Sequence, residues 1–430
     1  MAFLFRRSVN QSLLKALAIL IVMTLIVCIH LEFESTKLLI YKSDVETNVR
    51  RRSHQLRHNN FNLFNSFHNT SRRRKKIFLA FFYWEQLTMS TNNLLHLTAL
   101  GAYGRRQVVV PFVKDSQFRG VPTSEGYEKL ARYFNVSALN YTLRSHGHAT
   151  LINWEEFQDV CKGRLDVVVH FDYKDLKNTT TFSRAKPYVP CKQHRESEFH
   201  GIQIKRRICV NVFALDSVER FENEVVKKLP CVGIFEWRGT SKTNLDRTQF
   251  NITSVVGNVL SYRDISAFFS SNLLHIAHDF IAKNLDPNFI AVHIRTEQIL
   301  KTGRNISTLE KCLSNLKTRV QDIRHANTGP IHVFMATDFT EFGSSSKIGK
   351  PARKNAKSLM EILVPLKPII FQPSEYKLAD RGEVAIVEMN VLASGKHLVV
   401  LGGGSFQYWV ETQFLNKNNN DQTRVEHLSC

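Results

Sequence analysis

Three short apolar runs in the second half of the chain restrict its fold more than any other feature, because each ends in a polar or glycine-rich turn. The runs are Ile290 to Ile294, Ile331 to Met335 and Leu398 to Leu401, and their ends read His293-Ile-Arg295, Ala336-Thr-Asp338 and Gly402-Gly-Gly-Ser-Phe406. Runs of this length, separated by helix-like segments, predict parallel strands of an α/β sheet. Ligands of such sheets bind beyond the carboxyl ends of the strands. The three turns therefore predict a binding site.

A similar alternation fills the first half of the chain. Ile77 to Phe82 and Gln107 to Phe112 read as strands on either side of a helical stretch at 94–104. We expect further strands at 165–170, 209–213, 232–235 and 367–371, and helices at 265–285, 307–323, 353–362, 382–394 and from 405. The pattern predicts an α/β fold with two Rossmann-like domains that face a cleft. The expected domains are 77–285 and 286–430.

The N-terminal residues predict a membrane anchor and a stem. Residues 13–31 are the only apolar segment close to the roughly 20 residues that a spanning helix needs. Basic residues without acids precede this segment, which favours a cytosolic tail at 1–12 and a luminal remainder. The polar residues 32–76 read as a stem. No small-x-small cleavage site follows the segment, so an uncleaved anchor is preferred to a signal peptide.

Cysteines and glycosylation sequons support the luminal placement. Six cysteines lie outside the anchor, at 161, 191, 209, 231, 312 and 430. An even number is typical of disulfides in the secretory pathway, although the pairing stays open and reduced thiols are the alternative. Sequons occur at Asn69, Asn135, Asn140, Asn178, Asn251 and Asn305. Together these features predict a single-pass type II protein of the Golgi or endoplasmic reticulum membrane.

The net charge of +20 first suggests nucleic acid. However, half of that charge lies in residues 1–76, the predicted tail, anchor and stem. The remaining domain is only moderately basic. An anionic small substrate therefore fits better than a nucleic acid partner.

Several enzyme classes lack their motifs in this sequence. There is no Asp-x-Asp and no CxxC, so no metal site is indicated. The P-loop pattern GxxxxGK[ST] and the GxSxG elbow are also absent. Gly402-Gly-Gly404 is not GxGxxG and comes late in the chain, which argues against a dinucleotide oxidoreductase. A site that neutralises phosphate without a metal remains.

The residues at the three strand ends suit such a site. Arg295 is a candidate for the fixed cation, because its planar fork of donors matches phosphate. The turn at 402–406 can aim backbone N–H groups at an anion, and Ser405 is a candidate both for a hydroxyl donor and for the cap of the next helix. Asp338 is a candidate acceptor for ribose or base. Each residue also has a purely structural alternative. Arg295 would form an ion pair with Glu297 or Glu383, Asp338 would cap a loop, and the glycines would only allow close packing.

The same motifs resemble a known family. His293-Ile-Arg295 followed by Glu297 is similar to the His-Leu-Arg motif of the GDP-fucose protein O-fucosyltransferases, with spacing like that of the plant branch. Val333 to Asp338 resembles the family's second strand motif, and Ser394 to Phe406 resembles its late segment, which ends in Ser-Ser-Phe. The resemblance covers 77–112 and 289–410 in scattered motifs.

This resemblance implies a GT-B-like fold and a metal-independent, inverting transfer from GDP-fucose, with no cofactor. It implies that Arg295 binds the diphosphate and stabilises departing GDP. His293, Gly404, Ser405 and Phe406 would line the donor site, and Asp338 would hold the nucleoside. The acceptor would be a hydroxyl of a luminal protein or glycan.

Two departures from the family concern the first loop and the late turn. Gly404 stands where the family has the first Ser of Ser-Ser-Phe, and Thr88-Met-Ser90 replaces an Asn-Gln motif. Glu85 is the first candidate for the general base, because it directly follows the first strand. Glu297 is the second candidate. Asn92 and Asn93 are candidates for polar contacts to substrate, and Glu236 to Gly239 for a loop that faces the acceptor.

The leading hypothesis is therefore a fucosyltransferase of the secretory pathway. One alternative keeps the fold and changes the donor or acceptor. The other is a catalytically inactive luminal protein that binds glycans or acts as a scaffold, which the altered first loop suggests.

Overall fold

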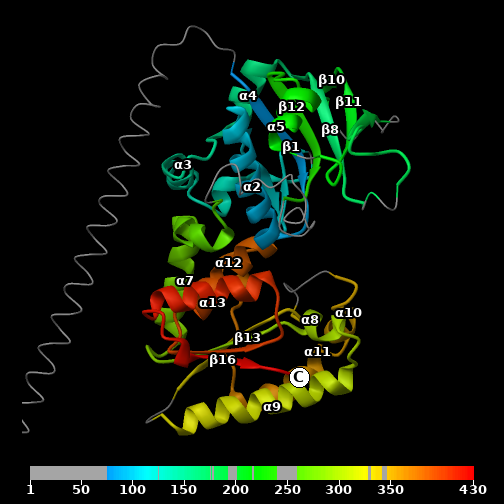
Figure 1. Cartoon of the computed structure of the whole chain (residues 1–430). Helices are drawn as coiled ribbons and strands as arrows, with labels where there is room; N and C mark the ends of the chain where they lie inside the picture. The colour runs from blue at the N-terminus through cyan, green and yellow to red at the C-terminus, as the bar shows by residue number, and fades with distance from the viewer. Residues whose placement is uncertain are drawn as a thin grey trace, which may run out of the picture. The chain divides into compact units, whose positions relative to one another are not determined.

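The structure is a computed structural model that describes residues 75–430, apart from 124, 175, 177–178, 192–200, 216, 240–258, 328–330 and 341–345, and only the backbone of 266–267. Lys75 to Cys430 form one compact unit (Figure 1). The predicted tail, the anchor at 13–31 and the stem up to residue 74 lie outside the described residues. Within the described part, no helix is both long enough and apolar enough to cross a membrane.

The first half of the unit is built on a large sheet whose centre is parallel. The described strands pair in the order β6-β2-β1-β12-β8-β11 in parallel, β9 joins β11 antiparallel, and the meander β4-β3-β5 branches from the end of β1. The bounds are β1 (Ile77–Tyr83), β2 (Gln107–Val109), β3 (Phe112–Lys114), β4 (Gln117–Arg119), β5 (Glu128–Lys129), β6 (Leu151–Ile152), β8 (Val167–Asp172), β9 (Tyr188–Pro190), β11 (Arg207–Asn211) and β12 (Cys231–Trp237). The predicted central strands are thus present, although the run Gln107 to Phe112 divides into β2 and β3 around Pro111.

Helix α2 (Leu87–Gly104) occupies the interior of this half. It packs against β1, β2 and β4, and it also contacts α13, which belongs to the second half. Nearly every residue of α2 is buried, including the polar Thr88, Ser90, Thr91, Asn92, Asn93, His96 and Thr98. The other helices here are α3 (Val136–Ser145), α4 (Trp154–Cys161) and α5 (Val218–Arg220). A two-stranded ladder of β7 (Arg164–Leu165) and β10 (Gln203–Ile204) lies beside the sheet.

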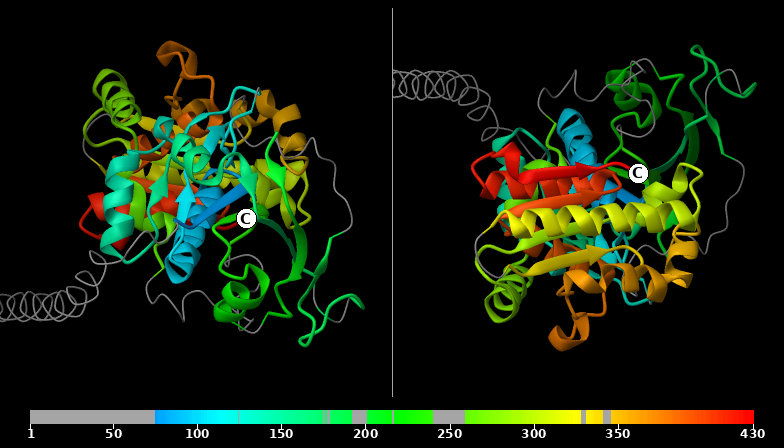
Figure 2. Two further views of the ribbon diagram at one scale, coloured as in Figure 1. Left: turned by 90° about the horizontal axis from the view of Figure 1, so that it is seen from above. Right: turned by 90° about the horizontal axis from the view of Figure 1, so that it is seen from below.

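The second half is built on a four-stranded parallel sheet in the order β14-β13-β15-β16. Its strands are β13 (Ile290–Ile294), β14 (Val333–Thr337), β15 (His397–Leu401) and β16 (Val425–Leu428). Side chains alternate along β13: Ile290, Val292 and Ile294 pack toward α9 and α11, whereas Ala291 belongs to the core shared with the first half. The view from below shows α9 running across one face of this sheet (Figure 2).

Helices were predicted close to five of those in the second half, whereas α8 and the separate short helix α10 were not predicted. The helices of this half are α7 (Ser271–Asn284), α8 (Thr296–Lys301), α9 (Ile306–His325), α10 (Lys350–Lys354), α11 (Ala356–Leu363), α12 (Arg381–Leu392) and α13 (Ser405–Lys417). The predicted helix 265–285 is divided into the 3-10 helix η6 (Tyr262–Phe268) and α7, because Ser270 caps a new helix start. The predicted strand 367–371 was wrong: only Ile369 bridges to Phe334, and Pro368 next to it has no N–H to donate.

The packing of α7 differs from the predicted division of the chain. We assigned 265–285 to the first domain, but Phe280 of α7 contacts Phe334 of β14 and Phe371. Helix α7 also packs along α12. It therefore covers the second sheet. Amphipathic spacing shows that a helix has a buried face, but it does not show which sheet that face meets.

A buried hydrogen-bond network joins the two halves. The Tyr133 hydroxyl donates to Asp380, the N-cap of α12, and that carboxylate also accepts from the backbone of Asp115 at 2.6 Å. Arg132 forms a two-pronged ion pair with Glu383, with both contacts at 2.8 Å. One apolar core continues through both halves. The mixed α/β fold is confirmed, and the halves are joined by packed side chains.

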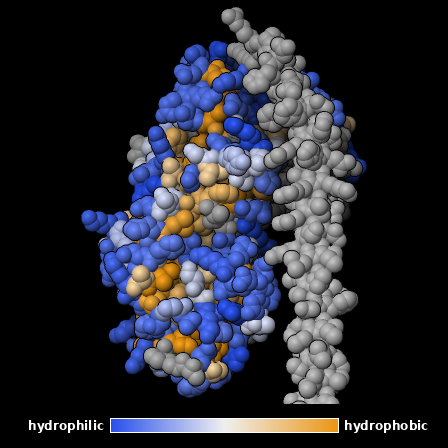
Figure 3. All heavy atoms as spheres, turned by 90° about the vertical axis from the view of Figure 1, so that its left-hand side faces the viewer, coloured by the Kyte–Doolittle hydropathy of each residue, from blue (hydrophilic) through white to orange (hydrophobic). Residues whose placement is uncertain are grey.

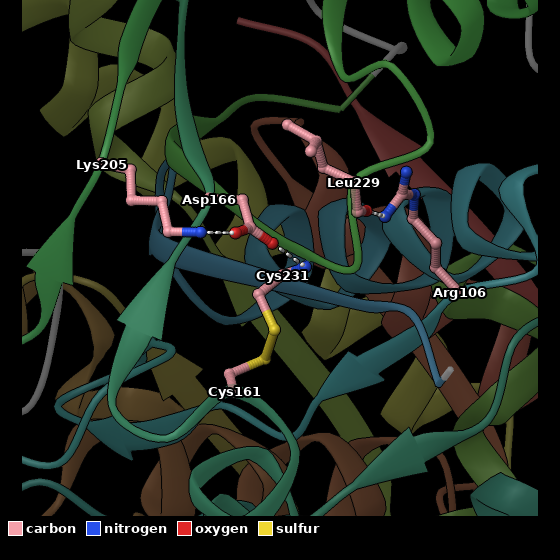
Figure 4. Close-up of a disulfide and its surroundings, with 6 residues drawn as sticks. All are labelled: Arg106, Cys161, Asp166, Lys205, Leu229 and Cys231. Carbon is pink, nitrogen blue, oxygen red and sulfur yellow. Dashed lines mark hydrogen bonds and ion pairs between the residues drawn. A yellow bond between two sulfur atoms is a disulfide. The ribbon is translucent and has the colours of Figure 1, made fainter. Parts of the chain in front are cut away.

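Three disulfides are formed, as the even number of cysteines predicted. They link Cys161 to Cys231, Cys191 to Cys209, and Cys312 to Cys430. Figure 4 shows the first, which ties the end of α4 to the start of β12. Beside it, Asp166 accepts from Lys205 at 2.8 Å and from the backbone of Cys231 at 3.1 Å. The disulfide and the ion pair both fix the amino end of the central strand β12.

Figure 3 shows one face of the molecule, on which hydrophilic residues surround apolar areas, with the broadest of these at mid-height. The large apolar side chains exposed in the described chain lie on different elements: Tyr103, Tyr141, Ile348, Val364 and Tyr408. Single exposed apolar residues are normal on protein surfaces, and no docking surface follows from them.

Candidate functional site

The three predicted turns meet at one edge of the second sheet. Strand β13 is paired in register with both neighbours, so that Ile294 lies opposite Thr337 on one side and Leu401 on the other. All three strands are parallel, and their carboxyl ends therefore bring Arg295, Asp338 and Gly402 to the same edge. The Arg295 backbone N–H donates to the Leu401 carbonyl at 2.8 Å, which extends the ladder into the turn.

The guanidinium of Arg295 lies over the glycine turn. A Cβ atom built on Gly404 would be 3.3 Å from Nη1 and 3.5 Å from Cζ of Arg295. The side chain is half-buried, and among the described residues it makes no hydrogen bond and no ion pair. Glu383, one of the two alternative partners, is held by Arg132. A half-buried cation without a protein acceptor is a candidate ligand-binding group.

Two glycines shape this turn. Gly402 has φ +116°, and a Cβ there would be 2.6 Å from the Arg295 carbonyl oxygen. Gly404 has φ +102° and ψ 169°, a conformation that side-chain-bearing residues rarely adopt. The departure from Ser-Ser-Phe at Gly404 therefore has a physical reason. The backbone geometry favours glycine, and a Cβ there would lie in close contact with the Arg295 guanidinium.

Ser405 and Phe406 begin helix α13, and the prediction that Ser405 caps this helix was wrong. Gly404 is the N-cap and makes no side-chain bond. Ser405 occupies the first helical position instead, and in the described chain neither its hydroxyl nor the N–H groups of Ser405 and Phe406 have a protein acceptor partner. Free N–H groups at the start of a 13-residue helix favour an anion.

His293 lies under this turn as a neutral side chain. It is 5% exposed, and its ring is 5.6 Å from the ring of Phe406. Burial and the nearby Arg295 lower its pKa from 6.5 to about 3. Nδ1 is buried without a hydrogen-bond partner. His293 is therefore uncharged at neutral pH and cannot serve as a second cation for phosphate.

Asp338 holds the start of helix α8. Its carboxylate accepts from the backbone of Thr296 at 2.8 Å, from the Thr296 hydroxyl at 2.6 Å and from the backbone of Glu297 at 2.9 Å. Burial raises the pKa of Asp338, and these donors counteract that rise. The capping alternative is thus realised in the structure, while nucleoside binding by Asp338 stays a prediction.

Helix α8 carries two more side chains to this edge. Glu297 is half-buried, and its carboxylate has no hydrogen-bond or ion-pair partner in the described chain, so that pairing with Arg295 is not seen. Gln298 was missed by the sequence reasoning. Its Nε2 atom would be 3.4 Å from a Cβ on Gly404, close to the Arg295 guanidinium. No sequence signal marks Gln298, because an isolated glutamine in a helix is usually a surface residue.

The candidates from the first half lie at the carboxyl end of β1 and on α2. Glu85 adopts φ +67°, and its carbonyl accepts from the Ser90 hydroxyl at 2.8 Å. Asn92 contacts His96 at 3.3 Å, and the Asn93 amide donates to the Trp84 carbonyl at 3.0 Å. These asparagines therefore support the local fold. Their only demonstrated link to the Arg295 turn is the packing of α2 against α13.

The predicted acceptor loop forms a compact cluster. Arg238 lies 5.0 Å from the ring centroids of both Trp84 and Tyr173 and pairs with Glu236 at 2.8 Å. Trp237 is fully buried, and its indole donates to the Asn93 carbonyl at 2.8 Å. The core alternative for Trp237 is therefore correct. Binding of an acceptor by this loop stays a prediction.

A separate cavity of about 210 Å³ lies at the opposite, amino-terminal ends of β15 and β16. Its charged side chains are neutralised locally, because Arg319 pairs with Glu426 and Arg424 pairs with Asp421. This cavity offers no unpaired cation. In the described chain no three His, Cys, Asp or Glu side chains gather as they would around a metal ion.

Comparisons with known proteins complete the description. No family model and no curated protein matches the chain. Among solved structures, the chain is similar to the apo form of POFUT1 (TM-score 0.49, 12% identity, 84% of this chain and 100% of that one). It is also similar to fucosyltransferase NodZ from Bradyrhizobium (0.38, 11%, 79% and 92%) and to a mutant of Arabidopsis thaliana FUT1 in complex with GDP (0.35, 10%, 80% and 70%). These are fucosyltransferases, the class that the motifs resemble. Similarity at this level assigns no role to any residue here.

Proposed function

We propose that the chain is a glycosyltransferase that binds GDP-fucose at the Arg295 turn and transfers fucose to a hydroxyl group. The observation that carries this proposal is the half-buried Arg295 guanidinium, which has no acceptor among the described residues and lies against Gly404 at the start of α13. A diphosphate supplies the acceptors that these donors lack. The ordered motifs around His293, Asp338 and Ser405 supply the choice of GDP-fucose.

In the proposed reaction, an acceptor oxygen attacks C1 of fucose from the face opposite to the diphosphate. The new C1–O bond forms as the bond from C1 to the β-phosphate oxygen breaks, and the configuration at C1 inverts. The leaving GDP gains negative charge, which Arg295 and the free N–H groups of α13 stabilise. Charge stabilisation of this kind, by fixed donors, is usually a large part of catalysis. A divalent metal is not required in this proposal.

The proton of the acceptor hydroxyl must pass to a base. Glu85 and Glu297 remain the candidates, in that order. Glu85 follows β1 directly, and Glu297 is one helix position from Gln298 near the anion site. If one of them is the base, its change to glutamine lowers kcat and leaves the affinity for GDP unchanged. A variant that binds GDP normally and retains kcat removes that residue from the mechanism.

We further propose a GT-B-like enzyme in the membrane of the Golgi or endoplasmic reticulum, anchored by residues 13–31 and acting on luminal proteins or glycans. The disulfides Cys161–Cys231, Cys191–Cys209 and Cys312–Cys430 support an oxidising compartment. Protease protection of the chain in sealed microsomes tests the orientation. Digestion of the disulfide-bonded part without detergent would contradict it.

A second candidate function is glycan binding without turnover. Thr88, Met89 and Ser90, which stand in place of the Asn-Gln motif, are buried in the first turn of α2 and do not offer a loop to a substrate. An inactive member of the fold would show this feature. A different sugar donor on the same site is the remaining enzyme alternative.

One experiment separates these functions. The full chain in detergent is incubated with a panel of nucleotide sugars and acceptor glycoproteins, and nucleotide release is measured. We expect acceptor-dependent release of GDP from GDP-fucose only, with no loss on addition of a chelator. Arg295→Ala should lower this activity by roughly 10²- to 10³-fold, as for loss of a transition-state donor. Full activity of Arg295→Ala would reject the proposed role. Glycan binding with no turnover of any donor would favour the second candidate.

A further inference from the structure

The glycine turn brings together two side-chain donors, only one of which the sequence indicated. We propose that Gln298 is a substrate-binding residue that contacts the diphosphate together with Arg295 and sets the affinity for the nucleotide. This inference rests on the proposed function. It adds a specific residue of helix α8 to the donor site.

The geometry points to one shared ligand position. Around the point where a side chain on Gly404 would begin, Arg295 Nη1 is 3.3 Å away and Gln298 Nε2 is 3.4 Å away. The two nitrogens therefore lie on the same side of the Gly404 backbone, close enough together for one diphosphate to reach both. Because Arg295 is the N-cap of α8 and Gln298 lies on that helix, one rigid element carries both groups.

Neither side chain donates a hydrogen bond to another described residue. Among the described residues, the Gln298 amide has no hydrogen-bond partner, and Arg295 has none either. Both side chains are half-buried, so that water can satisfy them without ligand and an anion can replace that water. The first N–H groups of α13 add further donors at the same turn. The set therefore selects a ligand that is rich in acceptors and negatively charged.

The chemistry of the pair favours a diphosphate over a carboxylate. Arg295 can bind two oxygens through its planar fork, and a glutamine amide can bind a third without adding charge. A neutral second donor stabilises an oxygen of the β-phosphate while leaving the charge balance of the site to Arg295. Asp338 supports both groups indirectly, since it fixes the start of α8 through Thr296 and Glu297.

The ordinary alternative is that Gln298 is a helix surface residue with no contact to ligand. Three variants of the full chain distinguish the two views. Gln298→Met keeps the length of the side chain and removes its donors. Gln298→Glu keeps the shape and lowers the net charge by one. Lys301→Gln is the matched control, because it lowers the charge equally at an exposed position on the same helix.

Affinity for GDP, inorganic pyrophosphate and guanosine is measured by calorimetry, and KM and kcat are measured with GDP-fucose. We expect Gln298→Met to lower the affinity for GDP and the affinity for pyrophosphate by the same factor of roughly ten, as for loss of a hydrogen bond to a charged group. Gln298→Glu should weaken both by more, because its carboxylate repels phosphate. Lys301→Gln should change neither by more than about twofold, which is the scale of a screened surface charge. The melting temperature without ligand should stay that of the wild type.

The possible outcomes distinguish a failure of this inference from a failure of the proposed function on which it rests. If the wild type binds neither GDP nor pyrophosphate, the proposed function fails and the role of Gln298 fails with it. If the wild type binds GDP and both Gln298 variants bind equally well, only the role of Gln298 is rejected. A loss of guanosine affinity in Gln298→Met would also reject it, because the contact would then be with the nucleoside.

Discussion

Helix α2 follows the carboxyl end of β1 in the first sheet, the Arg295 turn follows the carboxyl end of β13 in the second, and both carry a cluster of polar residues. On α2 several polar groups are bonded within the protein: Asn92 contacts His96, the Asn93 amide donates to the Trp84 carbonyl, and Thr98 contacts His148 at 3.0 Å. Two oxygens of this helix, Thr91 Oγ1 and Asn93 Oδ1, are buried without a hydrogen-bond partner in the described chain. At the Arg295 turn, Arg295, Gln298 and Ser405 have no protein partner among the described residues. The difference teaches that a buried polar cluster can be structural, and that donors without acceptors indicate a ligand more strongly.

Two arginines make this comparison quantitative. Arg106, in the first half, is 1% exposed and forms a fork with Glu222 at 2.8 and 2.9 Å, and it also donates to the Leu229 carbonyl (Figure 4). Its charge is fully used inside the protein. Arg295 is half-buried and makes no hydrogen bond or ion pair in the described chain, although its charge, alongside the larger effect of burial, acts to lower the pKa of Asp338 and of His293. The same substitution should therefore lower stability at Arg106 and lower ligand affinity at Arg295.

The largest effect is expected for Arg106→Met. Loss of the cation leaves the Glu222 carboxylate buried without its partner, which typically costs about 3–5 kcal/mol of unfolding free energy. Arg295→Met should leave the unfolding free energy nearly unchanged and abolish GDP binding. Denaturant unfolding and calorimetry with GDP measure both quantities. If Arg295→Met destabilises the chain as strongly as Arg106→Met, Arg295 has a structural partner and the comparison fails.

A second effect concerns acid stability and involves one histidine from each region. Burial, with a smaller contribution from His148, lowers the pKa of His96 from 6.5 to about 4, and burial lowers that of His293 to about 3. The unfolded chain then binds more protons than the folded chain below pH 6.5. Stability is therefore fully present above pH 6.5 and is lost as the pH falls toward 4 and then 3, by up to about 1.4 kcal/mol per pH unit for each histidine.

Unfolding free energies measured from pH 7.5 to 4.5 test this linkage. In His96→Gln, the unfolding free energy should fall less steeply with decreasing pH than in the wild type. Bound GDP should change only the contribution of His293 to this pH dependence. An unchanged slope in both His96→Gln and His293→Gln would mean that neither histidine is buried in the neutral form.

A smaller effect distinguishes the two roles of Asp338. Asp338→Ala removes the acceptor for the start of α8 and should cost roughly 1–2 kcal/mol, as for loss of a helix cap. Asp338→Asn keeps one oxygen acceptor and should cost less. Both are measured by thermal unfolding with and without GDP. If Asp338→Asn folds normally but loses GDP affinity while guanosine binding is also lost, Asp338 contacts the nucleoside directly.

The last and smallest prediction concerns glycosylation. It compares asparagines whose amide nitrogens are free with one whose amide nitrogen is bonded to the protein. Asn135 and Asn305 are exposed helix caps whose amide nitrogens are unused, whereas Asn140 bonds both the N–H and the carbonyl of Leu151, at 2.7 and 3.0 Å. We expect glycans at Asn135 and Asn305 and none at Asn140 after expression in secretory cells, read by peptide mass spectrometry. An unmodified chain at all three would contradict the luminal placement.

The sequence by itself determined the strands β1, β13, β14 and β15, the even cysteine count that became three disulfides, and the meeting of Arg295, Asp338 and Gly402 at one edge. The physical reason is local, because period, turn residues and parallel register need only short windows of sequence. Those same windows placed Arg295 in the site. They also produced the errors at 367–371 and at Ser405, where a proline and a glycine N-cap changed the hydrogen bonding.

Only the tertiary structure decided which polar groups form hydrogen bonds or ion pairs within the protein. It assigned Asp338 to the start of α8, Glu383 to Arg132, and the polar side of α2 to the interior, and it brought Gln298 next to Gly404. These pairings join residues that are distant in sequence, as for Arg132 and Glu383, or depend on a side-chain direction that spacing does not record. Whether a donor is satisfied is a property of the packed chain, and short windows of sequence do not record it.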